Sequence, residues 1–123
     1  ENDKEEIIRA TELLKQGGRL IILVPAHQYL FSPFDKAIGH FRRYNKARLQ
    51  EVIPSILQEQ KIFYLDCLGY FASLTNKWFL KKEYPTLKDV KFWDRIIVPV
   101  SKLIDPIIGY STGKSLIGIW QKK

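Results

Sequence analysis

Arg19-Leu-Ile-Ile-Leu-Val-Pro25 is the stretch that decides the fold, because it is an uninterrupted apolar run that leads directly into a polar segment. The aliphatic residues from Leu20 to Val24 do not alternate with polar ones. This pattern is typical of a strand covered on both faces, as in a parallel sheet flanked by helices. Ligands of such sheets bind at the carboxyl ends of the strands. We therefore expect a β-strand over 19–24 and a functional loop directly after it.

The composition is that of one globular domain. The chain has 123 residues, of which 46% are hydrophobic and 27% are charged. It is therefore long enough to bury a core, and its composition excludes disordered and collagen-like classes. No run approaches membrane-spanning length. The single cysteine, Cys67, excludes an internal disulfide and a cysteine-rich metal site, and we expect it to pack as a small apolar side chain in a reducing compartment.

Helical and strand patterns flank the apolar run on both sides. Apolar residues at helical spacing predict a helix over 4–16, which Asn2 or Asp3 would cap and Gly17 and Gly18 would end. The later patterns predict a helix from Asn45 over Leu49 to Leu57, which Pro54 kinks or restarts, and then a short strand over 62–66. An amphipathic helix over Phe71–Phe79 would reach the Lys81-Lys82-Glu83 group. A helix from Asp89, which Pro99 interrupts, and a strand over 115–120 would complete the chain.

The opening helix and strand form the second half of a strand–helix–strand unit whose first strand this chain does not contain. We therefore expect one edge of strand 19–24 to pair with a segment outside the chain. The sequence begins with Glu and has no Met, from which we expect that upstream residues have been removed. No leader-like pattern stands at its start. The missing part could be a tag, a presequence or a half-domain, and the organisation of the chain favours the half-domain.

The segment after the strand gathers the side chains best suited to chemistry. His27 and His40 are candidate general bases, because imidazole titrates near neutral pH, although each could instead fix the loop by hydrogen bonding. Arg42 and Arg43 offer planar donors for a carboxylate or phosphate, and a structural salt bridge with Asp35 is an equally open interpretation. This loop is therefore the predicted site.

Four segments of the chain carry a family resemblance. They are Lys15-Gln-Gly-Gly-Arg-Leu20, Val24-Pro-Ala26, the selective motif Phe34-Asp35-Lys-Ala-Ile-Gly39-His40-Phe-Arg42-Arg43-Tyr44, and Gly113-Lys-Ser-Leu-Ile-Gly118. With them the chain resembles the C-terminal half of a class I S-adenosylmethionine-dependent methyltransferase over essentially all its length. It is most similar to the branch associated with glycan or lipid-linked substrates.

The resemblance implies an α/β fold, namely the C-terminal part of a Rossmann-like methyltransferase domain over residues 1–123. Its elements would be a helix, the fifth strand, an acceptor loop, the sixth strand, a helical cap and the seventh strand, with the seventh strand antiparallel between the fifth and sixth. The N-terminal half, which would bind S-adenosylmethionine, is absent by this interpretation. We therefore assign no cofactor-binding residue and expect this chain alone to be inactive.

The resemblance also suggests roles and partners. His40 and His27 would be catalytic, and Asp35, Arg42, Arg43 and Tyr44 would bind the substrate, although for Tyr44 we favour packing. The acceptor would be a small molecule or a lipid- or glycan-linked compound. The missing half, or another chain, would pair along the 19–24 edge.

The sequence argues against two other functions, phosphate binding by a P-loop and nucleic-acid binding. The segment Gly109-Tyr-Ser-Thr-Gly113-Lys114-Ser115 lacks the glycine spacing and the following helix of a phosphate-binding loop, so we reject that function. The net charge of +7 is scattered, which disfavours nucleic-acid binding.

The aromatic residues and lysines between Tyr70 and Gly109 leave open an alternative, a non-catalytic basic module at a lipid surface. A helical cap over the sheet and the substrate pocket is the favoured interpretation of this segment. The expected location is cytoplasmic, with possible peripheral contact to a membrane.

Overall fold

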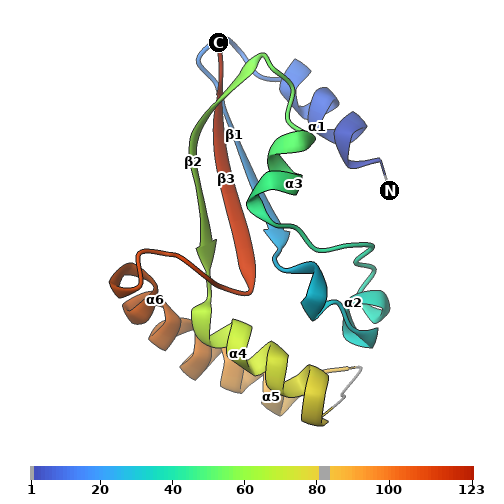
Figure 1. The fold of residues 1–123 in the computed structure, drawn as a ribbon, viewed down its shortest axis with the longest axis vertical. Coiled ribbons are helices and arrows are strands. Elements are labelled where there is room, and N and C mark those ends of the chain that lie inside the picture. The colour runs from blue at the N-terminus through green and yellow to red at the C-terminus, as the bar shows by residue number, and fades with distance from the viewer. Residues whose placement is uncertain (1, 81–83) are drawn as a thin grey trace.

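A three-stranded sheet organises the fold, which the computed structural model describes for residues 2–80 and 84–123 (Figure 1). The strands are β1 (Arg19–Pro25), β2 (Leu57–Leu65) and β3 (Ser115–Lys122), in the spatial order β1-β3-β2. β3 runs antiparallel to both neighbours, so β1 and β2 are parallel to each other. The expected mixed α/β class, the three strands and the central antiparallel last strand are thus confirmed.

Helices α1 (Asp3–Glu12) and α3 (Lys46–Glu51) lie on the same side of the sheet (Figure 1). The core forms between these helices and the sheet, around the buried side chains of Trp120, Leu116 and Leu49. The Trp120 indole lies against Gly118, where any β-carbon would overlap the ring. A glycine in the central strand therefore lets a large aromatic residue fill this core.

The predicted helix boundaries are partly wrong, and the contacts explain why. Asn2 caps α1 as expected, but the helix ends at Glu12, before the glycine pair. The ammonium of Lys122 in β3 donates to the carbonyls of Thr11 and Leu14 at 2.9 and 2.8 Å and satisfies the helix end there.

The boundary between α3 and β2 also differs from the prediction. Asn45 caps α3 as expected, but α3 ends at Glu51, ahead of Pro54, and Leu57 already belongs to β2. Pro54 therefore separates a helix from a strand, and the strand predicted over 62–66 starts five residues earlier than expected.

A helical cap covers the end of the sheet at which β1 and β2 finish (Figure 1). It consists of α4 (Cys67–Thr75), a π-helical turn over Asn76–Leu80, α5 (Leu87–Phe92), a second π-helical turn over Trp93–Ile97 and α6 (Val98–Ile107). Pro99 does not interrupt this last helical run, contrary to the prediction. It stands at the start of α6, directly after the second π-helical turn, so the hydrogen-bonding pattern changes just before it while the helical run continues. The Lys81-Lys82-Glu83 group lies outside the described residues.

The expectation that strand 19–24 is covered on both faces is wrong for this chain. Leu20, Ile22 and Val24 pack against the core, whereas Ile21 and Leu23 are each 64% exposed. The apolar run fails to alternate because both faces of β1 are apolar, although the described residues cover only one of them.

The outer edge of β1 is also open along most of its length. At its carboxyl end, Tyr44 forms a parallel bridge to Ala26, but among the described residues no strand pairs with the outer edge over 19–24. β1 therefore presents both an unpaired edge and an apolar face.

Candidate functional site

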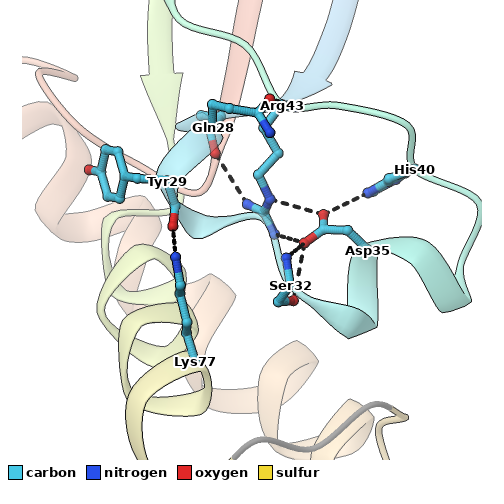
Figure 2. Close-up of polar contacts among 8 residues, drawn as sticks. Gln28, Tyr29, Ser32, Asp35, His40, Arg43 and Lys77 are labelled. Atoms are coloured by element: carbon cyan, nitrogen blue, oxygen red, sulfur yellow. Dashed lines mark hydrogen bonds and ion pairs between the residues drawn. The ribbon is translucent and has the colours of Figure 1, made fainter.

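The loop between β1 and α3 is built around one buried carboxylate. Asp35 lies in α2 (Pro33–Ala37), is 0% exposed, and accepts a hydrogen bond from the Ser32 backbone N–H at 3.0 Å. Arg43 donates to it in a bidentate manner, from Nε at 2.9 Å and from Nη2 at 3.1 Å (Figure 2). The third nitrogen, Nη1, donates to the Ala26 carbonyl at the end of β1. This ion pair therefore ties the loop to the strand.

The electrostatics of Asp35 agree with this structural role. Burial alone would raise the pKa of the carboxyl group, but the hydrogen bonds from Arg43 and His40 outweigh burial and lower the pKa below its usual value. Of the two open interpretations for Arg43, the structural salt bridge is thus what the geometry shows. A role of Arg43 in substrate binding stays a prediction.

His40 approaches Asp35 from the side opposite to Arg43 (Figure 2). Its Nδ1 lies 3.1 Å from Asp35 Oδ1, and its side chain is 39% exposed. A histidine oriented by a buried carboxylate is the usual arrangement of a general base. His40 does not line the cavity described below, so its catalytic role stays a prediction.

His27 lies in an aromatic cluster directly after β1. Its ring stacks on Tyr64 at a centroid distance of 4.9 Å and contacts Tyr29 and Tyr70 at 5.3 and 5.2 Å. Burial lowers the pKa of His27, even though a hydrogen bond with the Gly113 backbone opposes the shift. The imidazole is therefore neutral at physiological pH, as a base must be.

The backbone and one ring nitrogen of His27 are both unusual. Its φ angle is 64°, in the left-handed region that non-glycine residues rarely adopt. Its Nε2 is buried and has no hydrogen-bond partner among residues 2–80 and 84–123. Such features gather at functional sites, although His27 does not line the cavity either.

Arg42 and Tyr44 turn towards α1. Arg42 Nη1 pairs with Asp3 Oδ2 at 3.1 Å, and the buried Tyr44 donates its hydroxyl hydrogen bond to the same carboxylate. Burial, followed by the Asp3 contact, raises the pKa of Tyr44 to about 12. The packing favoured for Tyr44 is what the structure shows, and the loop thereby anchors the N-terminal helix.

A cavity of about 420 Å³ lies between this loop and the helical cap. Its lining includes Leu30 and Arg43 from the loop, which are both buried, and Lys114, which directly precedes β3. On the α5 side the lining is exposed and includes Tyr84 and Phe92. The cavity therefore opens towards α5 and has its floor at the end of the sheet.

Lys114 is the residue at this floor that the sequence predictions did not assign to the site. It directly precedes β3, where Gly113 lies so close to the Leu65 backbone that no β-carbon would fit. The Lys114 ammonium sits 3.8 Å from the centroid of the Trp93 ring. Burial lowers its pKa, and the nearby Arg43 adds to this shift while Asp66 opposes it.

A second carboxylate network positions Trp93. Asp66, at the end of β2, caps α4 by accepting from the Gly69 N–H at 3.0 Å, and it also accepts from Ser101 Oγ at 2.8 Å and Trp93 Nε1 at 3.2 Å. Asp105 accepts in turn from the backbone N–H of Asp66 at 2.8 Å. The Trp93 ring beneath Lys114 is thus positioned by Asp66, which Asp105 holds in turn.

The structure offers little support for metal or thiol chemistry. Within the described part of the chain, no group of His, Cys, Asp or Glu side chains is arranged to hold a metal ion. Cys67 is buried as predicted, and burial together with Asp105 raises its pKa to about 11, so it is not a reactive thiolate.

Comparison with known proteins gives no family assignment, since no family model, no curated protein and no solved structure matches the chain. The site is therefore interpreted from its own geometry. It is a largely apolar cavity at the carboxyl ends of two parallel strands. Among the residues that the structure describes, its charged lining consists of Arg43, Lys114, Asp89 and Asp94, and the neutral His27 lies nearby.

Proposed function

We propose that this chain is the acceptor-binding part of an S-adenosylmethionine-dependent methyltransferase. The arrangement of β3, antiparallel between the parallel strands β1 and β2, carries the proposal, because it is the arrangement that the family resemblance predicts. The Asp35–Arg43 loop and the cavity stand at the carboxyl ends of those strands, where α/β sheets bind ligands.

The cofactor is expected to bind outside this chain. The open edge of β1 over 19–24 and the apolar face around Ile21 and Leu23 are the surfaces on which further strands and a helix would pack. S-adenosylmethionine supplies an activated methyl group on a sulfonium. The residues described here would hold the acceptor, exclude water and manage its proton, which is most of what an in-line transfer requires from protein.

If the acceptor is a hydroxyl group, a base is needed, and two histidines are candidates. His40 is oriented by Asp35, whereas His27 is neutral and has a free Nε2. In the complete enzyme, His40→Ala should lower kcat by about a hundredfold or more if His40 is the base. A loss of only a few-fold would exclude that role and favour His27, which His27→Gln would test in the same assay.

The proposed activity can be tested on the full-length protein that the gene containing this chain encodes. Purified protein of this kind should transfer a labelled methyl group from S-adenosylmethionine to a compound in a lipid or glycan extract. The chain alone serves as the control and should be inactive. Transfer that Arg43→Met and His40→Ala both leave unaffected would contradict the site.

The exposed face of the cap supports a second candidate function, contact with a lipid surface. Large apolar side chains recur every three or four residues from α5 to α6 and are 37–82% exposed, namely Phe92, Ile96, Val100, Leu103 and Ile107. Basic residues follow a similar spacing beside them, namely Lys88, Lys91, Arg95 and Lys102. An apolar stripe bordered by cations is typical of helices that lie in a membrane interface.

This second function would be peripheral. None of the helices formed by the described residues has the length and apolar character that crossing a bilayer requires. Vesicles containing anionic phosphatidylglycerol should co-sediment the protein, and Leu103→Glu/Ile107→Glu should abolish this binding. Ile21→Glu/Leu23→Glu, on the sheet face that is uncovered in this chain, is the matched control when both variants are made in the chain alone. Equal loss in both variants would contradict a specific role of the cap.

A further inference from the structure

Of the two cations that line the cavity in the described part of the chain, Lys114 is the one without a carboxylate at ion-pair distance. Among residues 2–80 and 84–123, its ammonium forms no ion pair, and its close contact is the face of Trp93. Building on the proposed function, we propose that Lys114 binds the anionic group of the acceptor, a single carboxylate or phosphate, while an apolar body of the same molecule fills the rest of the cavity.

The neighbouring carboxylates are already engaged elsewhere. Asp35 accepts from Arg43, Ser32 and His40. Asp66 accepts from three donors on α4, the second π-helical turn and α6. Both carboxylates attract the Lys114 ammonium through space, but neither lies at ion-pair distance, so the partly buried ammonium rests on the face of an aromatic ring. An anionic ligand would add the direct ion pair that these carboxylates do not form.

Arg43 does not compete with Lys114 for the ligand. All three of its side-chain nitrogens already donate to Asp35 or to the Ala26 carbonyl, so its guanidinium is fixed by the fold. It lines the same cavity as Lys114. Asp35 balances the charge of Arg43, so Lys114 carries the positive charge at the floor of the cavity that is available to an anion.

The remaining lining defines the rest of the ligand. Most of it is apolar, with Leu30, Phe34, Ala72 and Ile97 among its members. Asp89 of α5 and Asp94 of the second π-helical turn also line the cavity and would repel a second anionic group. The favoured ligand therefore has one charged head and an uncharged body, and polyanions are disfavoured.

Matched ligands with six-carbon chains test this inference on the chain itself. Hexanoate and hexyl phosphate should bind at least about tenfold more tightly than hexanol, because a charged hydrogen bond contributes about 1.5–3 kcal/mol. The two anions distinguish a carboxylate from a phosphate head. Hexanol that binds as tightly as both anions would overturn the proposal, without any need for a variant.

Variants then assign the effect to Lys114. Lys114→Met should reduce binding of the preferred anion about tenfold or more and leave hexanol unchanged, whereas Lys114→Arg should retain the preference. Lys88→Met, on the outer side of α5, is the control for non-specific attraction. Equal losses in Lys114→Met and Lys88→Met would overturn the assignment.

Spectroscopy locates the ligand independently of affinity. The chain has three Trp residues, so its ¹H–¹⁵N spectrum contains three indole signals, and Trp93→Phe assigns one of them. Hexanoate should shift the Trp93 signal selectively. These readouts require no methyl transfer, so failure here would leave the proposed activity standing, and failure of the methyl-transfer assay would leave the anion site standing.

Discussion

Arg43 and Lys114 line the same cavity, but their positive charges have different surroundings. Arg43 is buried with a bidentate carboxylate partner and holds the loop to β1. Lys114 rests on an aromatic ring and has no carboxylate at ion-pair distance in the described part of the chain. In this chain the buried charge with a carboxylate partner belongs to the scaffold, and the partly buried charge without one is where we propose that a ligand binds.

Breaking the Arg43 side of the comparison should have the largest effect. Arg43→Met leaves the fully buried Asp35 carboxylate without its partner, which should lower the free energy of unfolding by about 3–5 kcal/mol. Urea titration measures this loss. Arg95→Met, at an exposed position, is the control and should change stability by less than about 0.5 kcal/mol. Similar values for the two variants would contradict the scaffold role.

Acid should weaken the same network. Because the pKa of Asp35 is lower in the folded chain than in the unfolded one, its contribution to stability is complete above the unfolded value of about 3.9. The contribution is lost as the pH falls through the folded pKa. A carboxyl-detected NMR titration should therefore show Asp35 titrating below about pH 3.9. A midpoint above that value would show that burial, and not Arg43, dominates.

Removing the Lys114 charge should have a small effect on stability. Lys114→Met gives up a cation–π contact but also removes a poorly solvated ammonium, so the free energy of unfolding should stay within about 1 kcal/mol of wild type. Thermal and urea unfolding measure it beside Arg43→Met. A loss as large as that of Arg43→Met would mean that Lys114 is a structural residue as well.

The smallest effect is expected at Arg42, which neighbours Arg43 in sequence but pairs with Asp3 near the surface. Arg42→Met should lower the free energy of unfolding by only about 0.2–1 kcal/mol, since exposed ion pairs contribute little. Raising the salt concentration should reduce the difference further. A loss that approaches that of Arg43→Met would show that the two arginines share one network.

Much of the fold could be predicted from local sequence patterns. The apolar run, the cap residues Asn2 and Asn45 and the terminal strand are local signals, and the family resemblance added the strand order. Helix ends were harder, because the end of α1 depends on Lys122, which is distant in the sequence. The uncovered face of β1 was unpredictable, since an apolar strand does not reveal whether anything covers it.

The site was predictable only in part. The sequence predicted that an arginine could pair with Asp35, and the structure shows that Arg43 does so through two hydrogen bonds. The sequence predicted no role for Lys114, because the phosphate-loop pattern that contains it lacks the required glycine spacing. Its importance comes from Trp93 and the cavity, which tertiary packing brings to it, and no local pattern encodes those contacts.

The central claim is that this chain holds the acceptor side of a methyltransferase whose cofactor side lies elsewhere. Calorimetric titration with S-adenosylmethionine tests it most directly, on this chain and on the full-length protein that its gene encodes. The proposal predicts saturable binding to the longer protein and none to the chain alone. Saturable binding to the chain alone, or no binding to the longer protein, would contradict it.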